Sequence, residues 1–265
     1  MASPIMTDRH IIDLNADIGE ADTADWAWAE AQIVMAISSA NIACGGHAGD
    51  NETMRATVQA CKARGVVIGA HPAYPDRENF GRKSLILGQD ISAAQLTRSL
   101  TAQIVTLTEI AADQDMTVSY VKPHGALYND AVTDIEKARL ITQVIGYIDP
   151  KLILLGGPNS CMQIAAQDAG LTFIAEGFID RRYTDEGHLQ PRGKDGAVIK
   201  DTQMRLTQAC SLAQKGEVQT ASGNILTIQA RSLCLHGDSA GAVETAWQAR
   251  KAIENLGIKI QAFAA

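Results

Sequence analysis

Cysteines are few in this sequence, and their spacing suits neither a disulfide framework nor a zinc site. The 265 residues include five cysteines, an odd number, and no two of them form a Cys-x-x-Cys pair. Small secreted domains stabilised by disulfides usually carry an even set of cysteines, and structural zinc sites usually carry paired ones. We therefore expect a protein of the reducing cytoplasm without a cysteine-based metal site.

Basic clusters and long apolar segments are also absent. The formal net charge is −7 at pH 7, and without basic runs we expect no binding to nucleic acid or to an anionic membrane. No stretch approaches the ~18 apolar residues of a membrane-spanning helix, and the N-terminus lacks the pattern of a secretory signal. Hydrophobic residues nevertheless make up 46% of the chain, which is typical of a globular protein with a substantial core.

What the chain does contain is a regular alternation of short apolar runs and longer helical patterns. This alternation predicts a parallel α/β sheet with right-handed crossovers. Because no linker rich in Pro, Gly or Ser interrupts it, we predict one domain over residues 1–265. The expected strands are His10–Leu14, Ala40–Cys44, Val66–Ala70, Thr117–Val121, Lys151–Leu155, Leu171–Ala175 and Ser232–Leu235. The expected helices lie near Asp25–Ser38, Asn51–Arg64, Ser92–Asp113, Asp134–Tyr147, Asn159–Ala169, Asp201–Lys215 and Ala240–Leu256.

Nearly every expected strand ends in a cluster of polar residues, and this distinguishes two architectures. In an open sheet, ligands gather at one crevice where the strand order reverses. In a closed barrel, side chains from many strand ends meet at one mouth. The many contributing strands favour a barrel.

The first polar cluster, in HIIDLNADIGE, consists of Asp13, Asn15 and Asp17. In an extended chain these alternating residues share one face. Two carboxylates on one face can divide acid and base roles, or hold a metal or another cation. The alternative is a strand followed by an Asx turn that caps the next helix.

Histidines follow the expected strands more often than scattered surface residues would. Four of the six histidines, at positions 47, 71, 124 and 236, do so, whereas His10 and His188 do not. In VKPHGALYN, Lys122 and His124 stand two residues apart, so both are expected on the same side of the chain. No HExxH motif is present. The pattern therefore indicates general acid–base hydrolysis, with metal assistance left open. The candidate catalytic residues are Asp13, Asp17, His47, His71, Lys122 and His124.

A second group of residues is expected to bind the substrate. The segment FIDRRYTDEGHLQPR forms one long charged connection, in which Arg181 or Arg192 could hold a carboxylate through two hydrogen bonds. After His236, a strand–turn–helix start offers backbone N–H groups to an anion. The ordinary alternative for these residues is a solvated loop. The candidate substrate-binding residues are Asn15, Asn41, Arg181, Tyr183, Arg192, His236 and Asp238.

Six segments resemble the LamB/YcsF family, in order and from about residue 12 to 243. They are DLNADIGE, SANIACGGHAGD, GAHPAYPDRENFGRK, VKPHGALYN, FIDRRYTDEGHLQPR and LCLHGDSAGAV. The resemblance implies a distorted seven-stranded (β/α) barrel of the glycoside hydrolase/deacetylase type. It also implies ATP-dependent opening of 5-oxo-L-proline to L-glutamate, with this chain as the A component of a 5-oxoprolinase that includes subunits B and C. No nucleotide-binding motif is recognisable here, so ATP is expected to bind to the partners.

The sequence differs from the family pattern at a few positions and leaves two other functions open. Ala16 and Gly46 stand where the family often has Cys and Phe, which argues against an essential thiol at position 16 and predicts a reshaped pocket near position 46. One alternative is a metal-dependent amide hydrolase or deacetylase that works alone, with Asp13 or Asp17 and two histidines. The other is a non-catalytic scaffold within the complex, which would tolerate substitutions at the strand ends.

Overall fold

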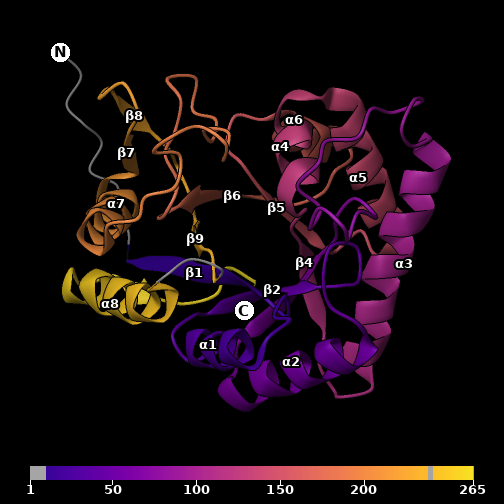
Figure 1. Ribbon diagram of the computed structural model, residues 1–265, viewed down its shortest axis with the longest axis horizontal. Helices are drawn as coiled ribbons and strands as arrows, with labels where there is room; N and C mark the ends of the chain where they lie inside the picture. The colour runs from indigo at the N-terminus through magenta and orange to yellow at the C-terminus, as the bar shows by residue number, and fades with distance from the viewer. Residues whose placement is uncertain (1–9, 238–240, 265) are drawn as a thin grey trace.

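Seven parallel strands form a closed barrel in the computed structural model, which describes residues 10–237 and 241–264 (Figure 1). Neighbouring strands pair in the order β1-β2-β3-β4-β5-β6-β9, and β9 pairs back with β1, with Asn15 opposite Cys234. The predicted seven-stranded (β/α) barrel is therefore confirmed. The strands are β1 (Ile11–Ile18), β2 (Ser39–Ala43), β3 (Val67–His71), β4 (Val118–Val121), β5 (Ile153–Gly156), β6 (Phe173–Phe178) and β9 (Ser232–Leu235). A short strand, β10 (Lys259–Ile260), pairs with the start of β1.

Helices surround this ring of strands (Figure 1). Their ends follow the local sequence: Ser92 and Gln95 form a capping box, and Gly65 ends a helix with a φ of 66°, as capping preferences predict. The helices are α1 (Ala24–Val34), α2 (Asn51–Arg64), α3 (Ala93–Ala112), α4 (Gly125–Thr133), α5 (Ile135–Ile148), α6 (Cys161–Asp168), α7 (Thr202–Lys215) and α8 (Ala242–Asn255). Among the described residues, no helix is long and apolar enough to cross a membrane.

Four elements were not predicted from the sequence. Helix α4 begins immediately after His124, and the antiparallel hairpin of β7 (Glu217–Gln219) and β8 (Ile225–Thr227) precedes β9. The fourth is β10. Because the barrel accommodates all these elements, the expected architecture is unchanged. The expectation of one domain over residues 1–265 stays a prediction.

Strand β1 alternates between an apolar face and a polar face. Residues 12, 14, 16 and 18 belong to the hydrophobic core. Asp13, Asn15 and Asp17 are buried too, but their side chains form hydrogen bonds with residues of the neighbouring strands. The strand continues to Ile18, so the Asx-turn interpretation of this segment is wrong and the predicted shared face is confirmed.

This polar face continues through the barrel interior as a ladder of hydrogen bonds. Asp13 accepts hydrogen bonds from the hydroxyls of Ser39, at 2.7 Å, and Ser232. Asn15 donates to the Ser232 hydroxyl at 2.6 Å. The Asn41 amide donates both to Asn15, at 2.7 Å, and to Asp17, at 2.8 Å. The ladder satisfies buried polar groups and fixes the position of the carboxylate at its upper end.

Candidate active site

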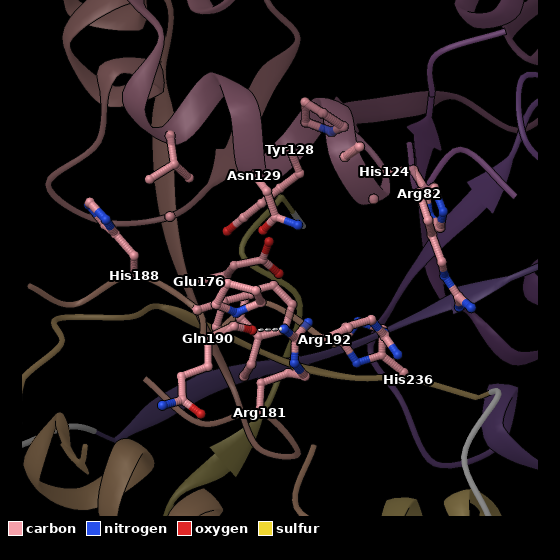
Figure 2. A pocket seen from close by; sticks show the side chains of 18 of the residues that line it. Arg82, His124, Tyr128, Asn129, Glu176, Arg181, His188, Gln190, Arg192 and His236 are labelled. Atoms are coloured by element: carbon pink, nitrogen blue, oxygen red, sulfur yellow. Dashed lines mark hydrogen bonds between the residues drawn. The ribbon is translucent and has the colours of Figure 1, made fainter. Parts of the chain in front are cut away.

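A cavity of about 500 Å³ lies at the end of the barrel where the parallel strands terminate. This volume is typical of small-molecule sites, which span about 300–1,000 Å³. Figure 2 shows that its walls come from separate elements: Tyr128 and Asn129 from α4, Arg181 and Arg192 from the β6–α7 connection, and other residues from the ends of strands. The cavity is therefore the point where distant segments of the chain meet.

The floor of the cavity carries an ion pair that crosses the barrel. The Lys122 ammonium lies 2.9 Å from Oδ1 of Asp17, which comes from a strand that does not neighbour β4. Burial acts to raise the pKa of Asp17, but His71 and Lys122 outweigh it and hold that pKa well below its usual range. Burial likewise acts to lower the pKa of Lys122, but Asp17, Cys234 and Glu176 hold it well above its usual range. Both groups are therefore charged at neutral pH.

Beside this pair, three imidazoles and a carboxylate converge. Nε2 of His47 lies 2.8 Å from Oε1 of Glu20, and Nδ1 of His124 lies 3.4 Å from the same oxygen. Nε2 of His71 lies 3.0 Å from Nδ1 of His124 and 3.4 Å from Oδ2 of Asp17. All four members of this cluster, which we call the histidine cluster (Glu20, His47, His71 and His124), are buried.

Local backbone features hold the histidine cluster in place. The turn after β1 has a φ of 80° at Gly19, and Glu30 of α1 accepts hydrogen bonds at 2.9 Å from the N–H groups of both Gly19 and Glu20. Burial raises the pKa of Glu30 to about 7. At Gly81, which has a φ of 62°, a Cβ atom would lie 2.9 Å from Cβ of His47. Only glycine therefore allows this loop to pack so closely over the rings.

Burial also sets the charge state of two of these histidines. It lowers the pKa of His47, and the neighbouring His71 lowers it further. It lowers the pKa of His124, together with the charges of His47 and His71. The rings of His47 and His124 are stacked with centroids 3.5 Å apart, so two imidazolium ions there would repel each other. The neutral form, which offers a lone pair, is favoured at both positions.

The opposite wall of the cavity is built from β6 and the long connection that follows it. Glu176 is fully buried, its carboxylate lies 3.4 Å from the Lys122 ammonium, and burial raises its pKa. The Arg181 guanidinium donates to the backbone carbonyl of Gln190 at 2.5 Å, and burial with the nearby charge of Arg192 lowers its pKa to about 10. Arg192 itself is exposed and lines the cavity.

Histidine 236, directly after β9, completes the rim. Its Nδ1 lies 2.9 Å from the carboxylate of Asp180, and its Nε2 lies 4.0 Å from Oδ2 of Asp17. Burial acts to raise the pKa of Asp180, but His236 outweighs it and holds that pKa at about 2. The Asp180 carboxylate therefore orients the ring, with Nε2 directed at the Asp17–Lys122 pair.

Sequence and structure comparisons agree on the family of this chain. Residues 12–265 match the LamB/YcsF family. The chain belongs to the LamB/YcsF family. Among its relatives, an A subunit of 5-oxoprolinase from Agrobacterium fabrum is 44% identical over 254 residues, which cover 96% of this chain and 98% of the relative. The 5-oxoprolinase A subunit of Streptomyces avermitilis is 42% identical, covering 96% and 100%. The crystal structure of a lactam utilization protein from Thermus thermophilus is 34% identical, covers 96% and 100%, and superposes with a TM-score of 0.86.

In this LamB/YcsF barrel, most of the predicted site residues line the cavity and the others lie behind it. Asp238 falls outside the described residues. The cavity is lined by Asp17, His71, Lys122, His124, Arg181, Tyr183, Arg192 and His236. Asp13, Asn15, Asn41 and His47 are buried and are not among its lining residues. The roles assigned to both groups stay predictions.

Two acidic residues of the site were not predicted from the sequence. Glu20 closes the motif DLNADIGE, three residues after Asp17, and its place just beyond a strand was the available signal. Glu176 lies inside β6, where a single acidic residue in an apolar run gave no sign that it faces the cavity. Both carboxylates lie within 4 Å of a candidate catalytic side chain.

The prediction that Gly46 reshapes the pocket is wrong. Gly46 is absent from the residues that line the cavity and borders a separate surface hollow with Gln103. A Cβ atom at Gly46 would lie 2.3 Å from Oε1 of Gln103. That amide holds the backbone N–H and carbonyl of Ala73, both at 2.9 Å, so the substitution concerns the packing of the loop after β3.

Proposed function

We propose that this chain is the A component of an ATP-dependent 5-oxoprolinase and opens the ring of an activated, phosphorylated 5-oxo-L-proline to give L-glutamate. The partner subunits B and C would bind ATP and supply the phosphorylation. The single observation that carries this proposal is the charged Asp17–Lys122 pair on the floor of a small-molecule cavity. The names of the relatives support the substrate and the existence of partner subunits.

Asp17 is the base that we propose for the attacking water. Its Oδ1 is held by the Asn41 amide and by the Lys122 ammonium, and its Oδ2, which lies 3.4 Å from Nε2 of His71, is the oxygen that would take the proton. The water would attack C5 of the phosphorylated lactam, and the C5–N bond would break as the nitrogen takes up a proton. A second water would then release inorganic phosphate from the γ-glutamyl phosphate so formed and leave L-glutamate. A positioned carboxylate contributes on the order of 10²–10⁴ to such a step.

Lys122 and Glu176 are suited to the other two tasks. The ammonium of Lys122 would stabilise negative charge that develops at the oxygen on C5. The raised pKa of Glu176 favours its protonated form, so this carboxyl could deliver the proton that the leaving nitrogen requires. Its position 3.4 Å from the Lys122 ammonium places this carboxyl beside the same part of the cavity.

Substrate binding would fall to the cationic residues at the rim. Among them, Arg181 is already engaged by backbone carbonyls of its own loop. Arg192 lines the cavity from a position exposed to solvent, and we propose that it holds the α-carboxylate of the substrate.

All five cysteines are free thiols, which supports the expectation that the complex works in the cytoplasm.

An assay of glutamate release from 5-oxoproline tests the proposal. The purified chain would be assayed alone and then with subunits B and C, each with and without ATP. We expect glutamate only when all three components and ATP are present, and we expect Asp17→Asn to abolish it. Absence of glutamate from the full set would overturn the proposal.

The same assay separates the alternatives. Glutamate released by this chain alone, without ATP, would favour an independent amide hydrolase. Full activity of an assembled complex that carries Asp17→Asn would favour a scaffold role. We give the catalytic role precedence because a scaffold has no need for a buried ion pair that faces a cavity, and such a pair is costly to bury.

A further inference from the structure

The histidine cluster has a geometry that its hydrogen bonds alone do not explain. One nitrogen or oxygen atom from each of Glu20, His47, His71 and His124 lies within 4.8 Å of the other three. The measured separations among them include 2.8, 3.0, 3.4 and 4.0 Å. Ligands of a tetrahedral Zn²⁺ ion, with bonds of about 2.0–2.1 Å, lie about 3.3 Å apart. The four atoms are thus spaced like the ligands of one ion.

Backbone carbonyls fix which nitrogens of two histidines carry a proton. Nδ1 of His71 lies 2.7 Å from the carbonyl oxygen of Lys122, and Nε2 of His124 lies 3.1 Å from that of Phe80. A carbonyl oxygen only accepts, so both of these nitrogens must donate. In the neutral rings, the remaining nitrogens, Nε2 of His71 and Nδ1 of His124, therefore present lone pairs.

Those two lone pairs face each other at 3.0 Å. Two acceptors at this distance repel unless a positive charge lies between them. A proton could bridge this one pair, and Nε2 of His47 also pairs with Oε1 of Glu20 at 2.8 Å, but neither contact accounts for the close approach of all four atoms to one another. A cation bound by all four atoms accounts for the whole cluster. Metal-bound histidines commonly donate their second N–H to a backbone carbonyl, as His71 and His124 do.

We propose that Glu20, His47, His71 and His124 bind one divalent first-row transition-metal ion, of which Zn²⁺ is the representative. Three imidazoles and a carboxylate suit Zn²⁺ better than Mg²⁺ or Ca²⁺, which prefer oxygen ligands. His71 and His124 also line the cavity, so the ion would border the substrate. There it would supply Lewis-acid chemistry. The proposal does not depend on the identity of that substrate.

A second group of possible ligands, Asp17, Cys234 and His236, lies nearby. This group already holds a cation, because the Lys122 ammonium is 2.9 Å from Asp17 and 3.0 Å from Sγ of Cys234. Burial raises the pKa of the Cys234 thiol, and a metal ligand must be a thiolate. The histidine cluster contains no lysine, so it is the site to which we assign the ion.

The first experiment measures the ion and its ligands in the unaltered chain. Protein stripped with a chelator would be titrated with Zn²⁺ at neutral pH, and bound metal counted by elemental analysis after gel filtration. We expect about one equivalent. X-ray absorption should show only nitrogen and oxygen neighbours, with imidazole signatures and no sulfur at about 2.3 Å. Lack of retained zinc, or a sulfur ligand, would overturn the proposal.

Matched variants then locate the site. Glu20→Gln and His71→Asn should each weaken Zn²⁺ binding by roughly 10–100-fold or more. Loss of a residue that only hydrogen-bonds to a metal ligand already weakens binding by about 10–100-fold. Cys234→Ser and His236→Asn remove ligands of the second group and should leave the affinity and stoichiometry unchanged. The reverse pattern would place the ion in the second group and refute our assignment.

Folding must be separated from metal binding in these variants. Thermal unfolding of the metal-free proteins would be compared first, because the four residues are buried. Zn²⁺ should then raise the melting temperature of the wild type and of the second-group variants, but not that of Glu20→Gln. If a variant fails to fold, the absorption measurement on the wild type still decides the ligand set. An unchanged Tm of the wild type in excess Zn²⁺ would contradict the proposal.

Discussion

The two sides of the cavity are built in different ways. One side, which we call the histidine side (Asp17, Glu20, His47, His71, Lys122 and His124), comes from β1 to β4 and the turns after them, and is buried and interlocked. The other, which we call the arginine side (Arg181, His188, Gln190 and Arg192), comes from one long connection and is partly exposed, except for Arg181. Glu176 joins them through its contact with Lys122.

The difference indicates a division of labour. Buried, preorganised groups can stabilise a transition state because they need little reorganisation. Partly exposed charges on a loop can meet a substrate from solvent and adapt to it. We therefore expect substitutions on the histidine side to lower kcat, and substitutions on the arginine side to raise KM. Three predictions test this contrast, in order of decreasing effect on catalysis, and a fourth concerns the stability of the barrel interior.

The largest effect is expected for Lys122→Met. It removes the charge proposed to stabilise the transition state, which should lower kcat on the order of 10²–10³-fold. It also leaves Asp17 buried without its cation, which should lower the free energy of unfolding by about 3–5 kcal/mol. Activity with subunits B and C and urea denaturation measure the two effects. Lys151→Met, at an exposed lysine, is the control. If Lys122→Met kept wild-type activity, the histidine side would not be needed for the chemical step, and the contrast between the two sides would fail.

Glu176→Gln tests the residue that joins the two sides. If Glu176 delivers a proton, kcat should fall on the order of 10²-fold. Because burial raises the pKa of Glu176 above 4.5 in the folded chain, the folded protein binds this proton more tightly and loses stability as pH rises above that value. The variant should lack that loss, so its stability relative to wild type should increase with pH. An unchanged kcat would make Glu176 a structural residue only.

Arg192→Ala should affect binding and spare the chemical step. Loss of one hydrogen-bonded charge contact, worth about 1.5–3 kcal/mol, should raise KM for the lactam roughly 10–100-fold, with kcat nearly unchanged. Steady-state kinetics with the complete complex distinguish the two constants. Arg139→Ala, at an exposed pair with Asp168, serves as the comparison. A drop in kcat without a change in KM would show that the arginine side takes part in the chemistry.

The last prediction concerns stability alone, at the lower end of the barrel interior. Burial raises the pKa of Asp13 from 3.8 to about 6. The folded chain therefore binds this proton more tightly, and wild type should lose up to about 3 kcal/mol of stability between about pH 4 and 6. Asp13→Asn should lack this loss, as measured by urea denaturation at a series of pH values. If the free energy of unfolding changed equally with pH in both proteins, Asp13 would not titrate in this pH range.

Much of the site could be predicted because its residues follow strands. His71, Lys122 and His124 stand at strand ends in the sequence, and parallel strands bring such ends together. The sequence could not predict how far below the cavity each residue of a strand lies. Whether a residue of β1 lines the cavity, like Asp17, or lies below it, like Asp13, depends on the stagger of the closed barrel. That stagger is set by long-range pairing, which no local pattern encodes.

Helix α4 and Glu176 were missed for related reasons. The nine residues of α4 follow His124 directly, without a side-chain cap, so the usual start signal was absent. Glu176 lies in a strand whose residues are mostly apolar, and a single charged residue in such a run is typical of a solvent-facing position. Its contact with Lys122 inside the barrel shows that it faces the cavity.

The closure of the barrel has a consequence for synthesis of the chain. Every residue of the histidine side lies within the first 124 positions, yet β1 is flanked on one side by β9, which begins at Ser232. Asp13, at the base of the interior ladder, is bonded to that serine. A nascent chain would therefore carry all the reactive groups of this side while one wall of the barrel was still inside the ribosome. The barrel, and with it the cavity, should close only after this last strand has emerged.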